Sequence, residues 1–198
     1  MTFKTYTYIS NAIFIGFIIL SGLFLWDIRN MQNTINNLRS ERDSLCIQNN
    51  LWLHKIDSVQ NILDSLPLGS PLDSIVVDAK FGIRKHPILK TWRKHKGIDL
   101  QGTYKDTIYA TGNGKVKKAR WSNGYGRIVT IQHTAGYEST YAHMNKIFVK
   151  KGQEIKKGDA LGTIGSSGLA SGTHLHYEVS RYKIKEDPQI YINNNYDK

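Results

Sequence analysis

The chain has 198 residues, of which 40% are hydrophobic, so it can bury a core and is not a disordered protein. Its single cysteine, Cys46, excludes an internal disulfide framework and a Cys-x-x-Cys metal knuckle. The net charge of +11 is uneven: residues 80–198 carry 22 Lys and Arg against 9 Asp and Glu, while residues 1–79 carry 5 against 7. The basic half indicates an acidic partner surface, but no nucleic-acid-binding motif accompanies the charge, so no nucleic acid is expected as a partner.

Residues 9–26 form an uncharged apolar run, preceded by a short N-terminal tail of residues 1–8. A run of this length lies at the lower end of what a transmembrane helix needs. A cleaved signal peptide is the competing interpretation, but the run continues into Trp26-Asp27-Ile28-Arg29, which offers no small-residue cleavage site. A helix of a soluble protein is a weaker alternative, because the segment is apolar all round and has no polar face. The sequence therefore predicts an uncleaved transmembrane signal anchor over residues 9–26.

Residues 28–66 show a heptad pattern in which ten of twelve successive a and d positions are apolar. Arg42 and Asn49 occupy the other two positions, as residues that set register or oligomeric state often do. Pro67 ends the pattern, because its ring removes a backbone donor and clashes with the preceding turn. We expect a coiled-coil stalk, roughly 58 Å long at the usual helical rise, that forms a homodimer or binds a partner protein. A single amphipathic helix packed against the C-terminal domain is the alternative.

Residues 67–80 are predicted to link this stalk to a domain of different character, residues 81–198. In that domain the helical periodicity gives way to short alternating apolar runs, such as residues 127–131 and 174–179. Glycine-containing turns such as Ser122-Asn123-Gly124 separate the runs. This pattern is typical of an all-β domain built from antiparallel strands.

Four histidines and one aspartate of this domain fall into two close pairs and one outlier. The pairs are His95 with Asp99 and His174 with His176, and the outlier is His143. Because side chains alternate along a strand, His174 and His176 should point to the same face, about 6–7 Å apart at their Cα atoms. Glu178 would lie on that face too, where it either hydrogen-bonds an imidazole or forms a surface salt bridge.

Gly97 argues against a helix between His95 and Asp99 and favours a loop that enters a strand, with close backbone approach at the glycine. Histidine and aspartate are nitrogen and oxygen ligands that suit zinc, and three such ligands leave a coordination position open for catalysis. Tyr141 would share a strand face with His143, so it either lines the same groove or packs in the core.

Six motifs occur in a fixed order along residues 81–188. They are residues 81–88, His95-Lys-Gly-Ile-Asp99, Gly124-Tyr-Gly126, Tyr141-Ala-His143-Met144, Gly165-Ser-Ser-Gly168 and Gly172-Thr-His174-Leu-His176. Together they resemble the lysostaphin-type (LytM-like) zinc endopeptidases of bacterial cell walls, with no departure at any metal or catalytic position. The resemblance covers nearly the whole C-terminal domain.

This resemblance implies antiparallel sheets with a barrel-sandwich-like groove and one Zn²⁺ per chain. It assigns His95, Asp99 and His176 as metal ligands and His143 and His174 as the catalytic pair. The expected activity is a zinc-dependent metalloendopeptidase that hydrolyses peptide bonds in peptidoglycan. The alternative is a non-catalytic scaffold or activator of other cell-wall hydrolases, since some membrane-anchored relatives with coiled coils have lost ligands; the intact set argues against it.

The resemblance also implies a location, because peptidoglycan lies outside the cytoplasmic membrane. We expect a single-pass protein of the cytoplasmic (inner) membrane whose catalytic domain faces the periplasm or cell wall. The charges beside the apolar run point the other way: Lys4 precedes it, and Arg29, Arg39 and Arg42 follow it. The positive-inside rule would place those arginines in the cytoplasm, so the expected orientation rests on the function.

Overall fold

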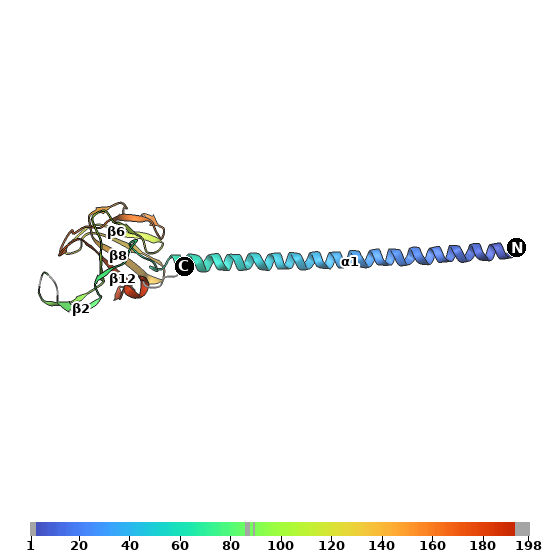
Figure 1. The fold of residues 1–198 in the computed structure, drawn as a ribbon, viewed down its shortest axis with the longest axis horizontal. Coiled ribbons are helices and arrows are strands. Elements are labelled where there is room, and N and C mark those ends of the chain that lie inside the picture. Colours follow the sequence, from blue (N-terminus) through green and yellow to red (C-terminus); the bar gives the residue numbers. More distant parts are fainter. Residues whose placement is uncertain (1–2, 86–87, 89, 193–198) are drawn as a thin grey trace. The chain divides into compact units, whose positions relative to one another are not determined.

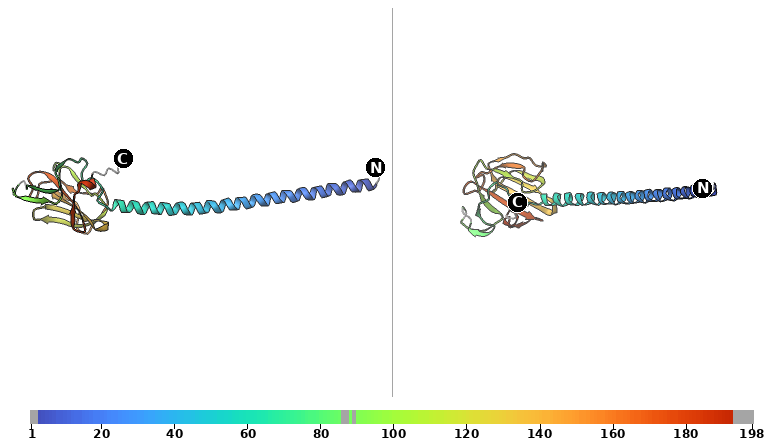
Figure 2. Two further views of the ribbon diagram at one scale, coloured as in Figure 1. Left: turned by 90° about the horizontal axis from the view of Figure 1, so that it is seen from below. Right: turned by 45° about the vertical axis from the view of Figure 1, so that its right-hand side comes forward.

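The computed structural model describes residues 3–85, 88 and 90–192, so His86, within the first of the six motifs, lies outside the described residues. The chain divides into two compact units, Met1–Asp57 and Ser58–Lys198, which are described separately. The first unit consists of helix, and the second holds the β-strands (Figures 1 and 2).

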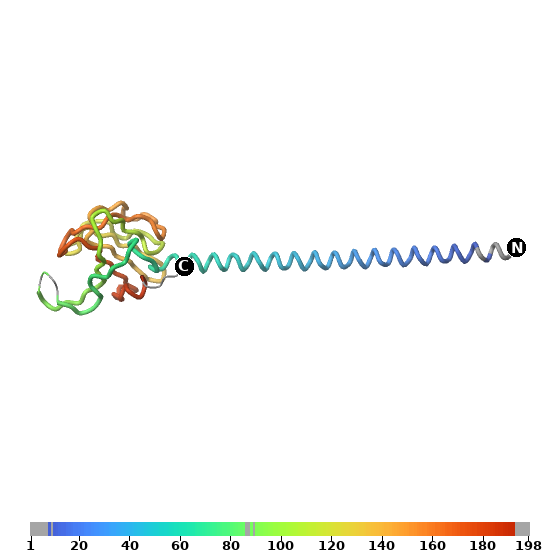
Figure 3. The backbone as a smooth tube through the Cα atoms, viewed as in Figure 1, coloured from blue at the N-terminus to red at the C-terminus, as the bar shows by residue number. Residues whose placement is uncertain are grey.

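Helix α1 (Phe3–Asp64) is one uninterrupted helix that contains the predicted anchor and all but the last two residues, Ser65 and Leu66, of the predicted stalk (Figure 3). Its apolar side chains are exposed along both segments, for example Phe17 at 71% and Ile56 at 61%. It is long and apolar enough to cross a membrane. The helix ends three residues before Pro67, as expected from the steric effect of that ring. The exposed apolar positions are compatible with pairing to another helix.

The second unit contains the predicted antiparallel strands, arranged in three sheets. The largest sheet has the order β1-β4-β12-β8-β7-β6-β10, with β13 also paired to β12. A three-stranded sheet has the order β5-β11-β9, and β2 and β3 form a two-stranded sheet of their own, a hairpin that extends from the rest of the domain (Figure 1). The strands are β1 (Val77–Ala79), β2 (Gly82–Lys85), β3 (Trp92–His95), β4 (Ile98–Gln101), β5 (Thr107–Tyr109), β6 (Gly114–Ser122), β7 (Gly126–Gln132), β8 (Tyr137–Met144), β9 (Lys146–Ile147), β10 (Glu154–Ile155), β11 (Ala160–Thr163), β12 (His174–Arg181) and β13 (Ile184–Glu186).

Two short helical elements complete the unit: a 3-10 turn (Thr134–Gly136) and helix α2 (Gln189–Ile192). Part of the segment predicted as a linker belongs to the fold, because Val77–Ala79 is strand β1 and Leu72 is buried in the core. The last residue of α1 also contacts the domain: the N–H of Asn113 donates to the carbonyl of Asp64.

The core of the domain combines apolar side chains with a buried hydrogen-bond network around Thr111. Strand β12 alternates as expected: Leu175 and Tyr177 are fully buried in the core cluster, together with residues of β4, β5, β8 and β11. Thr111 Oγ1 lies 2.9 Å from the hydroxyls of both Tyr141 and Tyr177, and the Thr111 N–H donates to Tyr141. Buried polar groups are tolerated when they are paired in this way. The network ties β8 and β12 together beneath the surface that carries the histidines.

Tyr141 is therefore a core residue and does not line the groove. The expectation that Tyr141 shares a strand face with His143 fails because His143 has a φ of +60°, outside the extended region. The alternation of side chains along β8 therefore does not continue through His143. The alternative of core packing is the one observed, with Tyr141 fully buried.

Gly97 lies between β3 and β4, where the backbone passes close to β12. A Cβ atom at this position would fall 2.2 Å from the carbonyl oxygen of Tyr177. This contact confirms that the glycine is needed for close approach rather than for an unusual φ. Gly97 thus lets the segment between His95 and Asp99 lie against the strand that carries His176.

Replacing Gly97 with alanine should force β4 and β12 apart. We expect Gly97→Ala to lower the free energy of unfolding of the domain by about 1–3 kcal/mol, as for other overpacking substitutions. Thermal unfolding followed by near-ultraviolet circular dichroism reports on the β-domain. Gly172→Ala is the matched control, because nothing lies within 4 Å of its added Cβ. Equal unfolding temperatures for the two variants would contradict the steric argument.

Candidate functional site

The site is built on two neighbouring strands of the large sheet. Asp99 on β4 and His176 on β12 are direct partners in the antiparallel register. Their side chains leave the sheet on the face opposite the core, because Ile98, Leu100 and Leu175 are fully buried on the other side. Nδ1 of His176 lies 2.8 Å from Oδ1 of Asp99. The strand register alone thus brings together two residues that are 77 positions apart in the sequence.

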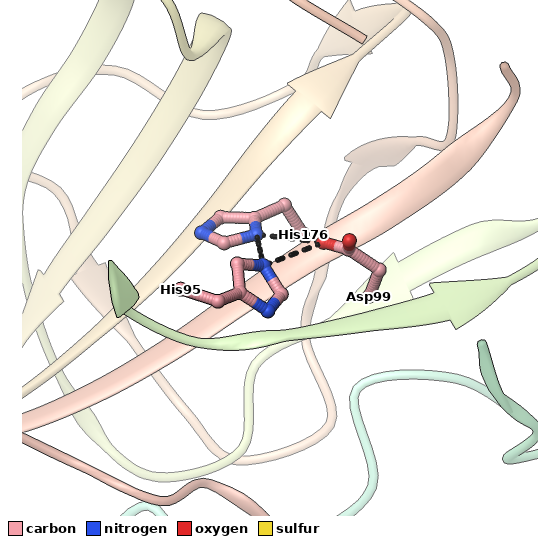
Figure 4. Close-up of side chains that lie close together, drawn as sticks. All are labelled: His95, Asp99 and His176. Carbon is pink, nitrogen blue, oxygen red and sulfur yellow. Dashed lines mark hydrogen bonds and ion pairs between the residues drawn. The ribbon is translucent and has the colours of Figure 1, made fainter. Parts of the chain in front are cut away.

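His95 reaches the same point from the hairpin. It is the last residue of β3, paired with Gly82 of β2, and the chain then turns through Gly97 into β4. Nε2 of His95 lies 3.1 Å from Oδ1 of Asp99 and 3.0 Å from Nδ1 of His176 (Figure 4). The structure therefore brings together the three predicted ligands, whose candidate ligand atoms all lie within 4.8 Å of one another.

The donor set fits a metal cation. Nδ1 of His95 lies 2.8 Å from the carbonyl oxygen of Lys80, and Nε2 of His176 lies 3.1 Å from Oε1 of Glu178. Both partners are acceptors, so these outer nitrogens carry the protons and the inner nitrogens face Asp99 as bare acceptors. Tetrahedral zinc separates its ligand atoms by roughly 3.3 Å, close to the 2.8–3.1 Å between these three atoms. Three converging acceptors need a positive charge between them.

In the absence of a metal, a proton can supply that charge at His176. Burial opposes the charged imidazole, but the carboxylates of Asp99 and Glu178 outweigh burial and raise the pKa of His176. Burial also opposes the ionised form of Asp99, yet the hydrogen bonds with His176 and His95 hold the pKa of Asp99 well below its ordinary value. The pocket therefore favours one positive charge next to an ionised Asp99.

Glu178 supports His176 from the outer side. It is only 2% exposed, and besides His176 it contacts Lys185, whose Nζ lies 2.6 Å from Oε2, and Tyr125, whose hydroxyl donates to Oε1. Burial opposes its ionisation, but His176 and Lys185 lower the pKa of Glu178 to about 2. Both alternatives considered for Glu178 are thus present in part: it is hydrogen-bonded to an imidazole, and its salt bridge is buried rather than superficial.

Arg84 on β2 holds the second oxygen of Asp99. Its Nη2 lies 2.6 Å from Oδ2 of Asp99, while Oδ1 faces the two histidines. One carboxylate oxygen is therefore engaged by the hairpin, and the other is directed at the histidine nitrogens. A charge-assisted bond of this kind fixes the orientation of the carboxylate.

His143 and His174 flank the cluster, with their ring centroids 4.9 Å apart. Nδ1 of His143 lies 2.8 Å from the carbonyl of Ser167, and Nδ1 of His174 lies 2.9 Å from the carbonyl of Gly172. A carbonyl only accepts, so in the neutral ring Nδ1 carries the proton and Nε2 is left as a basic nitrogen. Nε2 of His174 lies 3.7 Å from Oδ1 of Asp99, next to the candidate metal position.

His143 is held in a conformation that is uncommon for a residue other than glycine. At its φ of +60° the backbone N–H donates to the carbonyl of Tyr125, 2.9 Å away. Burial is the main cause that lowers the pKa of His143 to about 4, and the neighbouring His174 and His176 act in the same direction. At neutral pH His143 is therefore an uncharged base.

All five predicted residues line one cleft with a volume of about 270 Å³. Its other lining residues come from the β2–β3 hairpin, the turn between β3 and β4, the β6–β7 turn, the segment before β12 and β12 itself. They are Arg84, Arg93, Lys94, Lys96, Gly124, Tyr125, Leu169, Ser171 and Glu178.

Sequence reasoning did not identify the roles of Arg84, Tyr125 or the carbonyl of Ser167. Arg84 and Tyr125 stand within the recognised motifs, but nothing in their spacing indicates contacts with Asp99 and Glu178. The carbonyl that orients His143 belongs to the Gly165–Gly168 motif, whose glycines were the available signal.

The chain is similar in sequence to known peptidases. Residues 93–188 match peptidase family M23. The chain is 38% identical over 109 residues to the DD-carboxypeptidase/endopeptidase Mpg of Neisseria meningitidis serogroup B, covering 55% of this chain and 25% of that protein. It is 35% identical over 123 residues to the peptidoglycan DD-endopeptidase ShyC of Vibrio cholerae serotype O1, covering 62% and 28%. The chain thus spans only about a quarter of the length of these relatives.

A zinc-containing peptidase from Vibrio cholerae has a similar structure. The TM-score is 0.54 at 32% sequence identity, over 63% of this chain and 38% of the other. The family match falls on the unit that carries the histidine cluster, because it begins at Arg93 on β3 and ends at Pro188 before α2. The chain therefore carries, over residues 93–188, a domain of peptidase family M23, the lysostaphin-type (LytM-like) peptidases.

Proposed function

We propose that the protein is a membrane-anchored zinc metalloendopeptidase that hydrolyses peptide bonds in bacterial peptidoglycan. The observation that carries this proposal is the convergence of His95 Nε2, Asp99 Oδ1 and His176 Nδ1, with two further histidines beside them. A structural metal site would need a fourth protein ligand. The two remaining histidines instead hold their Nδ1 atoms against backbone carbonyls, which suits acid–base work.

One zinc ion held by His95, Asp99 and His176 would supply Lewis-acid polarisation of the scissile carbonyl and a water of lowered pKa. The protein supplies the rest. Neutral His143 accepts a proton at Nε2, because Ser167 keeps the Nδ1 proton in place. His174, 4.9 Å away between ring centroids, would stabilise the developing oxyanion when it is protonated at Nε2, and the proton that His143 accepts would pass on to the leaving amine. Either histidine could fill either of these roles, because a backbone carbonyl holds Nδ1 of both rings.

Peptidoglycan is proposed as the substrate because related peptidases are named for it. A non-catalytic scaffold remains the rival function, but it gives no reason to keep two histidines poised with bare nitrogens beside an intact ligand set. The histidines line a cleft of about 270 Å³, which is proposed to receive the peptide.

Residues 9–26 of α1 are proposed to cross the cytoplasmic membrane, with the catalytic domain in the periplasm or against the cell wall. The supporting observations are the length and apolar character of α1 and the location of the proposed substrate. Residues 28–66 are proposed to form a parallel coiled coil with a second copy. The apolar a and d side chains from Ile28 to Leu63 are exposed in the single chain, including Leu45 at 57%, whereas Leu66 is partly buried and lies beyond the end of α1.

Single substitutions separate metal binding from chemistry. We expect His176→Ala to reduce bound zinc from one per chain to near zero and to abolish release of new amine termini from cell-wall sacculi. His143→Ala should keep the zinc and lower the rate by ~10²–10⁴-fold, the usual contribution of general acid–base catalysis. Metal analysis and amine release on the purified full chain measure both quantities. A wild-type chain that binds zinc and releases no amines would favour the scaffold.

The orientation in the membrane can be measured directly. Protease added to spheroplasts should degrade the β-domain, because the proposal places it outside the cytoplasmic membrane. A cytoplasmic marker protein must stay intact in the same sample. Protection of the β-domain until the membrane is permeabilised would contradict the proposed location and agree with the simple charge count around residues 9–26.

The coiled coil predicts that one face of α1 is sensitive to charge. Leu45→Asp at a d position should shift the detergent-solubilised full chain from dimer to monomer, because a charge would be buried at the helix interface. Ile47→Asp is the matched control: Ile47 is 63% exposed in the single chain and lies outside the a and d positions. Sedimentation measures both masses. Equal behaviour of the two variants would argue against the proposed interface.

A further inference from the structure

The cations of the cleft are concentrated on the hairpin side. Arg84, Arg93, Lys94 and Lys96 line the cleft from the hairpin and the turn that follows it. The β6–β7 turn and the segment before β12 contribute only uncharged side chains, such as Tyr125 and Leu169. This division gives the cleft a positive wall next to the histidine cluster.

The two acidic residues of the cleft cannot balance this wall, because both are already engaged. Asp99 is paired with Arg84 and faces the histidines. Glu178 is buried and paired with Lys185, which lies outside the cleft lining. Three of the four cations are therefore left without a carboxylate from the cleft itself.

Of these three cations, Arg93 is the one that pairs with another cation across the hairpin. It is the direct cross-strand partner of Arg84 in the β2–β3 hairpin, and like charges in opposite positions destabilise a strand pair. Arg84 has Asp99 as its counter-ion, 2.6 Å away. The Nε–H of Arg93 donates only to the hydroxyl of Thr91, at 3.3 Å, and Arg93 forms no ion pair within the described part of the chain. A second anion beside Arg93 would relieve the repulsion.

Building on the proposed peptidase function, we propose that Arg93 binds a free carboxylate of the substrate peptide beside the scissile bond. A guanidinium presents two parallel N–H groups that match a carboxylate, and Arg84 already binds Asp99 from the same hairpin. Lys94 and Lys96 add to the positive field at the same wall. The site then selects peptides with a carboxylate next to the cleaved bond over neutral peptides such as oligoglycine.

The test uses two synthetic peptides that differ only in one group. One carries a free carboxylate next to the scissile amide, and in the other that carboxylate is amidated. The zinc-loaded full chain in detergent should cleave the free acid with a kcat/KM at least ~10-fold higher, as expected for one charge-assisted contact. Arg93→Gln should reduce this ratio to near 1, and Arg93→Lys should keep part of it.

Arg120→Gln is the matched control, because Arg120 is exposed on β6 and does not line the cleft. Its ratio should equal that of the wild type. Equal ratios for Arg93→Gln and wild type would overturn the proposal, as would an equal loss for both peptides in Arg93→Gln. If wild type cleaves neither peptide, the proposed function fails on its own, and fluorescence anisotropy of the labelled peptides then decides the role of Arg93. Tighter binding of the free acid that Arg93→Gln removes supports that role, and equal binding of the two peptides overturns it.

Discussion

The pairing of Asp99 with His176 across β4 and β12 is the constraint on which the rest of the site depends. A shift of one residue in this register would turn His176 into the core and expose Tyr177 in its place, because strand side chains alternate. Contacts on both faces of the sheet stabilise this register. Beneath the sheet, the hydroxyl of Tyr177 is locked by Thr111, while above it Glu178 fixes the outer nitrogen of His176.

The same pairing explains how a small domain keeps so many ionisable groups inside. Glu178 and Asp99 are nearly buried, yet each has a cation or an imidazole on every accessible oxygen. Removing any one partner would leave a buried charge uncompensated, which is far more costly than losing an exposed ion pair. The site is therefore a connected unit, and its members cannot be exchanged independently of one another.

Strand periodicity was enough to predict much of this arrangement. The period of two placed His174, His176 and Glu178 on one face, and Gly97 indicated close backbone approach. The prediction for Tyr141 failed because a single residue, His143, leaves the extended conformation, and no pattern of apolar residues encodes that change. The contact of Arg84 with Asp99 was also beyond the sequence, since it depends on how a separate hairpin lies over the large sheet. Whether α1 pairs with a second helix depends on a partner that one chain does not contain.

The β2–β3 hairpin forms a sheet of its own, and the contacts of its ends with the domain include the candidate metal site. His95 and Arg84 are two of these contacts, and both meet at Asp99. An element held by few contacts opens more readily than the strands of a core. A cation between His95, Asp99 and His176 would tie the hairpin to the sheet, so metal occupancy and hairpin closure are thermodynamically linked. By reciprocity, any ligand that holds the hairpin closed would raise the affinity for the metal.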